Sequence, residues 1–233
     1  MKVPVWLALG FASFFSTCTL VAGAAEINHA AISKRVIRDT ERVFGPGAAS
    51  RIAAWSELVT NNKDKPISEK LALTNSFFNR VPVKSEEEIW GHMHWSTPFE
   101  MLLHNAGSQA DHTIAKYITL EAMGISIDHM TITHVHSMKS SNLSYMVLTY
   151  HEKRGVVPLV LDTMNDEIKP ADQRTDLFPE DSLNDSGLWL SNKQKDERND
   201  AQEEAAVHVE LWNDMNARLD KEHLSTEDPG QMW

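Results

Sequence analysis

A single helix start constrains the fold of this chain more than any other stretch of its sequence. Gly107, Ser108 and Asp111 have the turn and N-cap chemistry that begins a helix. Apolar residues then recur at helical spacing: Ile114, Ala115, Ile118 and Ala122. The start of this buried helix therefore falls at Gln109 and Ala110. Many folds place a nucleophile at a helix N-terminus, because unpaired N–H groups and partial positive charge lie there, but this chain has an amide and a methyl group.

Residues 1–24 have the features of a secretory signal peptide. Lys2 precedes an apolar run over residues 3–21, and the small residues Ala22-Gly23-Ala24-Ala25 suit cleavage after Ala24. We therefore expect an exported protein. The chain has one cysteine, Cys18, inside this segment. The mature protein is thus expected to have no disulfide, no thiolate metal ligand and no thiol nucleophile.

Length and charge limit the organisation of the chain and its partners. The chain has 233 residues, and its 22 Lys and Arg against 33 Asp and Glu give a formal net charge of −11. A chain of this size buries roughly 70% of its unfolded surface in one core. We therefore expect one main domain over residues 25–190 and a charged helical extension over residues 191–233. The acidic balance disfavours nucleic acid and anionic lipid surfaces, because both would repel it.

The N-terminal part is expected to be helical. Apolar periodicity predicts three helices, over residues 30–44, 48–59 and 68–78. Ser68 is predicted to cap the third of them. The following segment is irregular and rich in aromatic side chains, and Trp90 and Trp95 are expected to wall a cleft or to fill a core.

The pattern changes after the central helix. Short runs rich in β-branched residues predict consecutive antiparallel strands, over residues 131–136, 145–150 and 156–162. Residues 169–190 are predicted to form a loop. A last helix carries an apolar stripe of Val207, Leu211, Met215 and Leu219, which we expect to pack on the same domain, because so narrow a face is marginal as a lone helix. The predicted fold class is α+β, with helices packed on an antiparallel sheet.

Several short motifs, in the same order along most of the mature chain, resemble those of a known protein family. They include Asn75-Ser76-Phe77-Phe78-Asn79, Trp95-Ser96-Thr97-Pro98, Ile114-Ala115-Lys116-Tyr117-Ile118-Thr119-Leu120, Pro158-Leu159-Val160-Leu161-Asp162 and Gly187-Leu188-Trp189. In these motifs the chain resembles the bacterial transglutaminase-like cysteine proteinases of the LapG type. The resemblance implies a papain-like/transglutaminase-like α+β fold, with a nucleophile at a helix start packed against a sheet that carries a histidine and an aspartate.

The resemblance also implies a biological setting. Members of the family are periplasmic enzymes that cut a large surface adhesin near its N-terminus and bind calcium beside the active site. The periplasmic domain of a LapD-type receptor for cyclic di-GMP holds them in check. We therefore expect a periplasmic protein whose partners are a LapD-type receptor domain or the N-terminal region of an adhesin.

The chain departs from the family at the positions that carry the chemistry. The family pattern at the helix start is Asp-Cys-Glu-Asp-Tyr, and the alignment places Gln109 on the cysteine and Tyr145 on the histidine. Asp162 alone remains of the triad. A glutamine amide is a poor nucleophile, and a tyrosine with a pKa near ~10 cannot serve as the resting base. These departures predict a pseudoenzyme, and the resemblance implies that it acts by binding in the control of biofilm adhesin retention.

The calcium positions are degenerate as well. Ser108 and Ala110 replace carboxylates, Asp111 is retained, and Met93 stands where the family has an acidic residue. Because calcium takes 6–8 oxygen ligands with carboxylates among them, we expect neither calcium nor another cofactor. Trp90, Trp95, Asp111 and His112 are predicted to line the binding cleft.

A hydrolase with rebuilt chemistry is the alternative. Ser108 and His112 lie four residues apart, a spacing that suits a Ser/His pair on one helical turn. The second route is a histidine-bound metal. It would use His134 with His136, or His92 with His94, joined by His104 or His112. A third reading is a structural periplasmic protein outside the adhesin pathway.

Overall fold

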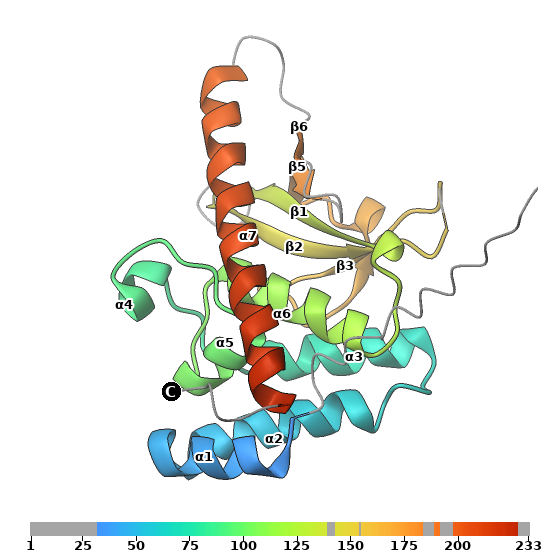
Figure 1. Ribbon diagram of the computed structural model, residues 1–233. Coiled ribbons are helices and arrows are strands. Elements are labelled where there is room, and N and C mark those ends of the chain that lie inside the picture. The colour runs from blue at the N-terminus through green and yellow to red at the C-terminus, as the bar shows by residue number, and fades with distance from the viewer. Residues whose placement is uncertain (1–31, 139–142, 154, 184–188, 192–197, 228–233) are drawn as a thin grey trace, which may run out of the picture.

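The computed structural model describes residues 32–138, 143–153, 155–183, 189–191 and 198–227 (Figure 1). The predicted signal peptide lies outside these residues. The helices are α1 (Lys34–Phe44), α2 (Pro46–Thr60), α3 (Ile67–Phe78), α4 (Glu86–Trp90), α5 (Pro98–His104), α6 (Gln109–Ala122) and α7 (Arg198–Glu227), with the 3-10 helices η1 (Ile127–His129) and η2 (Ala171–Gln173). The strands are β1 (Met130–Ser137), β2 (Leu143–Tyr150), β3 (Leu159–Leu161), β4 (Lys169–Pro170), β5 (Leu177–Leu183) and β6 (Trp189–Ser191).

Local chemistry sets the N-terminal helices. Ser33 caps α1 by accepting a hydrogen bond from the N–H of Val36, and Gly45, at φ 84°, ends α1 and leads into α2. The predicted cap of the third helix is wrong: α3 begins at Ile67 after Pro66, and no side chain caps it. The carbonyl of Pro66 instead accepts from the N–H groups of Glu69 and Lys70.

The strands form one antiparallel sheet in the order β4-β3-β2-β1-β5-β6. The three predicted strands are confirmed as β1, β2 and β3, with shifted ends. The predicted loop over residues 169–190 is wrong, because β5 lies within it and pairs with β1 across a register shift between His134 and Val135. This fold is α+β, as predicted.

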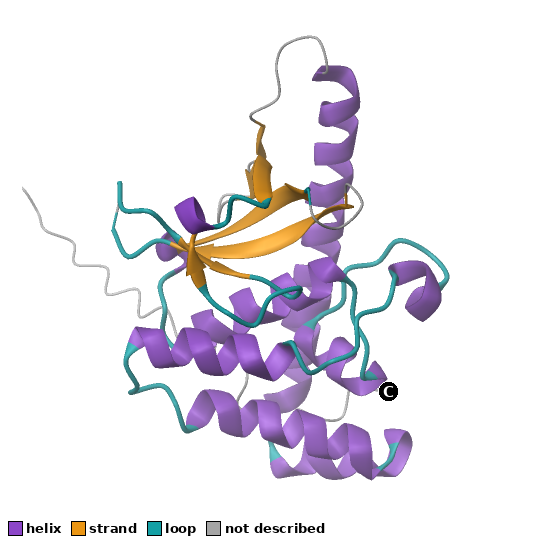
Figure 2. Cartoon of the chain, turned by 180° about the vertical axis from the view of Figure 1, so that it is seen from behind, coloured by secondary structure: helices purple, strands orange, loops and turns teal. Residues whose placement is uncertain are grey.

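Helix α6 lies between the sheet and the other N-terminal helices (Figures 1 and 2). Its sheet-facing side contributes Ile114 and Ile118 to one buried cluster, and its other side contributes Ala115 and Ala122 to a second cluster with α1, α2, α3 and α5. Trp55 of α2 also donates a 2.9 Å hydrogen bond from its indole to Thr119. Burial on both sides fixes α6, and with it the helix start that the sequence singles out.

Helix α7 runs along one side of the molecule (Figure 1). Met215 and Leu219 are buried in the cluster beneath the sheet, and Leu211 and Trp212 pack against it. The prediction that this stripe packs on the same domain is confirmed, except that Val207 is exposed. None of the helices in the described ranges is long and apolar enough to cross a membrane.

Candidate functional site

The start of α6 is held by a capping box. The Ser108 hydroxyl accepts from the N–H of Asp111, and the Asp111 carboxylate accepts a 2.8 Å hydrogen bond from the N–H of Ser108. The same carboxylate accepts a 2.6 Å bond from the N–H of Ser96 and a 3.1 Å bond from its hydroxyl. Burial raises the pKa of Asp111, against these hydrogen bonds, which lower it. Asp111 therefore fixes the loop before α5 to the start of α6.

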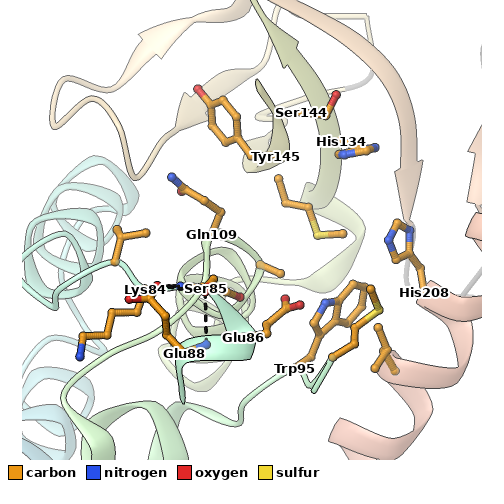
Figure 3. A pocket seen from close by; sticks show the side chains of 16 residues that line it. Lys84, Ser85, Glu86, Glu88, Trp95, Gln109, His134, Ser144, Tyr145 and His208 are labelled. Atoms are coloured by element: carbon orange, nitrogen blue, oxygen red, sulfur yellow. Dashed lines mark hydrogen bonds between the residues drawn. The ribbon is translucent and has the colours of Figure 1, made fainter. Parts of the chain in front are cut away.

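A cleft of about 470 Å³ opens at this helix start (Figure 3). Gln109 and Ala110 of α6, Glu86 of α4, Tyr145 of β2 and His208 of α7 all contribute to its walls. The cleft thus lies between the helix start and the sheet.

Gln109 occupies the position at which the resemblance implies a nucleophile. Its Nε2 donates a 3.0 Å contact to the sulfur of Met164. Its Oε1 is buried and has no hydrogen-bond partner among the described residues. An amide in this place can donate or accept a hydrogen bond, but it has no ionisable proton near neutral pH.

Tyr145 and Asp162 stand at the positions for which the resemblance implies a histidine and an aspartate, and they contact each other. The Tyr145 hydroxyl donates a 3.1 Å hydrogen bond to Oδ2 of Asp162, and the N–H of Met164 donates a 2.8 Å bond to Oδ1. Burial raises the pKa of Tyr145, and the neighbouring Asp162 carboxylate raises it further. The phenol therefore keeps its proton at neutral pH and acts as a donor.

Arg174 is a site residue that sequence reasoning missed. Its Nη2 lies 2.6 Å from Oδ2 of Asp162, and its Nε lies 3.0 Å from Oδ1 of Asp176. Arg174 is 5% exposed and Asp162 is 0% exposed, so this ion pair is buried. Nothing in the sequence pattern around Arg174 identifies Asp162 as its partner.

A second buried cation lies nearby. Lys116 of α6 is fully buried, and its Nζ lies 3.5 Å from the hydroxyl of Thr163. Burial lowers the pKa of Lys116 to about 7, while the charges of Asp162 and Asp166 oppose this shift. The Asp162 carboxylate therefore accepts hydrogen bonds from Tyr145 and Met164, forms an ion pair with Arg174, and acts on Lys116 through its charge.

The four residues predicted to line the cleft have different positions. Trp95 lines it. Trp90 does not: its indole donates a 3.2 Å hydrogen bond to the hydroxyl of Ser96, and its ring packs on His94 at 4.1 Å and His104 at 4.7 Å between centroids. Asp111 and His112 are 0% exposed and lie behind the cleft wall. Their role in binding stays a prediction.

The proposed Ser/His pair is not assembled. The ring nitrogens of His112 contact two backbone carbonyls, that of Ser108 at 2.8 Å and that of Val81 at 3.1 Å. The Ser108 hydroxyl accepts from the N–H of Asp111 instead. His112 consequently has no ring nitrogen left to accept a proton from Ser108.

The histidines fall into separate groups rather than one metal site. His134 lies against His208 at 6.0 Å and His92 against His94 at 5.8 Å between ring centroids, while His112 faces two carbonyls. In the part of the chain that the structure describes, no three His, Cys, Asp or Glu side chains are placed to hold a metal ion.

The degenerate calcium positions do not suit calcium. Ser108 caps α6 with its hydroxyl, Ala110 has no oxygen in its side chain, and the Asp111 carboxylate is taken by Ser96 and Ser108. These residues do not supply the oxygen set that this cation requires.

Comparison with known proteins rests on structure. No protein-family model matches the chain, and no curated protein sequence matches it. Legionella pneumophila LapG matches with 28% identity and a TM-score of 0.63 over 78% of this chain and 97% of the LapG chain. Its calcium-bound form matches with 32% identity and a TM-score of 0.61, over 70% and 91% of the two chains. An EGTA-treated form matches with 27% identity and a TM-score of 0.63.

Helices packed on an antiparallel sheet, with a buried helix start facing that sheet, define a transglutaminase-like fold. The similarity to Legionella LapG extends over nearly the whole of that protein. The chain belongs to the LapG family, a family of cysteine proteases.

Proposed function

We propose that this chain is a catalytically inactive LapG-type protein of the periplasm, which acts by binding a protein partner. The proposal depends on two residues of the site. Gln109 stands at the helix start, and Tyr145 donates a hydrogen bond to Asp162. The first residue is no nucleophile, and the second is no base. Loss of either role typically costs orders of magnitude in rate, so acyl transfer is not expected here.

The partner we propose is the periplasmic domain of a LapD-type receptor or, second, the N-terminal region of a large adhesin. The support is that the fold is similar to that of Legionella LapG over most of both chains, and that a cleft opens in this chain beside Gln109. A protein with this surface and no catalysis would compete with an active protease for the receptor. It would thereby tune the retention of the adhesin in a biofilm.

Calorimetric titration tests this proposal. The mature chain, residues 25–233, is titrated with the receptor domain from the same organism in calcium-free buffer, and then with the adhesin fragment. We expect micromolar or tighter binding to one of them, about −8 kcal/mol or better. Absence of heat with both partners would contradict a binding role.

A matched pair of variants locates the surface. Met93, at the cleft, is 59% exposed, and Val43, on α1, is 52% exposed. Met93→Glu is expected to weaken binding, because it places a charge in the contact, whereas Val43→Glu is expected to leave it unchanged. Equal effects of the two substitutions would place the partner elsewhere.

A further inference from the structure

One wall of the cleft is a short extended segment with an unused backbone edge. Val83 forms a parallel β-bridge with Gly107, the residue that precedes the cap of α6. In that bridge the N–H of Lys84 donates a 3.0 Å bond to the carbonyl of Gly107, and the N–H of Gly107 donates a 3.2 Å bond to the carbonyl of Pro82. The residues on either side of Val83 therefore make the bonds to Gly107.

The backbone groups of Val83 itself point the other way. Successive residues of an extended strand direct their N–H and C=O groups to opposite sides. Within the described ranges, neither group of Val83 takes part in a hydrogen bond. Val83 is 46% exposed and lines the same cleft as Gln109. A donor and an acceptor thus stand side by side on an open edge, which is the arrangement that an added strand uses.

A carboxylate stands three residues further along the chain. Glu86 is half-buried and lines the cleft. Figure 3 shows its carboxylate inside the cleft, near Trp95, while the side chain of Lys84 points away. Burial raises the pKa of Glu86, the Ser108 hydroxyl lowers it, and the charge of Asp111 behind it raises it.

Glu86 has no cation beside it among the described residues. The neighbouring acid, Glu88, is engaged differently, because its carboxylate accepts 2.9 Å hydrogen bonds from the N–H and the hydroxyl of Ser85 in the cap of α4. A basic group supplied by a bound molecule would stabilise the charged form of such a half-buried carboxylate.

We infer that the cleft binds an extended polypeptide segment, whose backbone pairs with the N–H and C=O of Val83 and whose basic side chain reaches Glu86. This inference rests on the proposed function, because it names the kind of segment that the cleft takes from a protein partner. Met93 lines the cleft and is 59% exposed, and Met164 contacts Gln109 and is 53% exposed, so both offer apolar contacts to such a segment.

The test uses the whole mature chain and small probes. The ¹⁵N-labelled protein is titrated with the blocked pentapeptide Ac-Ala-Ala-Arg-Ala-Ala-NH₂, with the same peptide carrying Gln in place of Arg, and with an Arg peptide whose backbone amides are N-methylated. We expect the amide signals of Val83 and Lys84 to move, and the Arg peptide to bind about tenfold more tightly than either of the others. Equal binding of the N-methylated peptide, or no shift at Val83 up to millimolar peptide, would overturn the inference.

Variants separate the carboxylate from its neighbour. Glu86→Gln is expected to remove the preference for Arg over Gln, and Glu88→Gln is expected to keep it, because glutamine also serves in the capping box. An unchanged preference in Glu86→Gln would contradict the assignment. Peptide mass is followed in the same samples. A cut peptide would contradict the proposed inactivity and leave the binding mode intact. An intact peptide that does not bind would contradict the binding mode and leave the proposed inactivity intact.

Discussion

The hydroxyl of Tyr145 donates to the carboxylate of Asp162 across 3.1 Å, at the two positions where the sequence resemblance implies a histidine and an aspartate. The same carboxylate oxygen is also 2.6 Å from Arg174. Two donors therefore share one acceptor, and the aspartate orients a phenol and not an imidazole. In this arrangement a phenol that keeps its own proton stands where the resemblance implies an imidazole.

Restoring the nucleophile alone is predicted to fail. In Gln109→Cys the thiol stands at a helix start, but Tyr145 offers no base, so we expect no cleavage of an adhesin fragment by electrophoresis. Cleavage by this single variant would contradict our explanation that the site lacks a base.

Adding the base is predicted to change the chemistry of that thiol. In Gln109→Cys with Tyr145→His, an imidazole can accept the thiol proton, so alkylation by iodoacetamide at pH 6 should be faster than in the single variant. Tyr145→Phe in place of Tyr145→His is the matched control and should give no acceleration. Equal rates in all three proteins would show that residue 145 does not reach the helix start.

Removal of Arg174 is predicted to destabilise the fold strongly. Arg174→Met leaves the buried Asp162 without its closest cation, which typically costs about 3–5 kcal/mol. Urea unfolding measures the free energy, and the companion variant Asp162→Asn tests the pairing. The double variant should lose less than the sum of the singles, and simple additivity would refute the coupling.

Glu222 is predicted to make stability fall with pH. Burial raises its pKa to about 8, Thr97 and Arg218 lower it, and Glu100 raises it. Between its ordinary pKa and about 8 the folded chain keeps the proton that the unfolded chain has lost, so this contribution decreases as pH rises through that window. Thermal unfolding of Glu222→Gln should therefore show a shallower fall between pH 5 and 8 than the parent chain.

One other titratable group and one control variant bear on the interpretation of this measurement. Lys116 overlaps only the upper end of the window: its folded pKa of about 7 lies below its ordinary value, so its contribution to stability rises with pH from about 7 upward, opposite in sign to that of Glu222. Glu222→Asp serves as the control, since it retains a carboxylate. An unchanged pH profile in Glu222→Gln would show that Glu222 does not hold its proton in the folded chain.

Parts of the fold that depend on local chemistry could be predicted from the sequence. Ser108 and Asp111 define the start of α6 within four residues, and apolar periodicity finds α2 and β2. Helix α5 was missed although Thr97 and Glu100 form a capping box, a signal that is present in the sequence.

The other features that the sequence did not predict depend on contacts between residues far apart in the chain. Strand β5 contains Pro179 and acidic residues, which have low strand propensity, and it forms because β1 supplies an edge to pair with. The Arg174–Asp162 ion pair joins two loops at the end of the sheet, and no periodicity encodes it. Likewise, the two carbonyls that face His112 come from separate segments, so spacing alone suggested a Ser/His pair.

Intact mass spectrometry of an adhesin fragment tests the central claim most directly. The N-terminal region of the adhesin is incubated with an equimolar amount of the mature chain, and an active LapG-type protease serves as the positive control. Our account predicts that the fragment keeps its full mass in the presence of this chain and is cut by the control. A truncated fragment formed by this chain would show that the site is catalytic and would contradict the account.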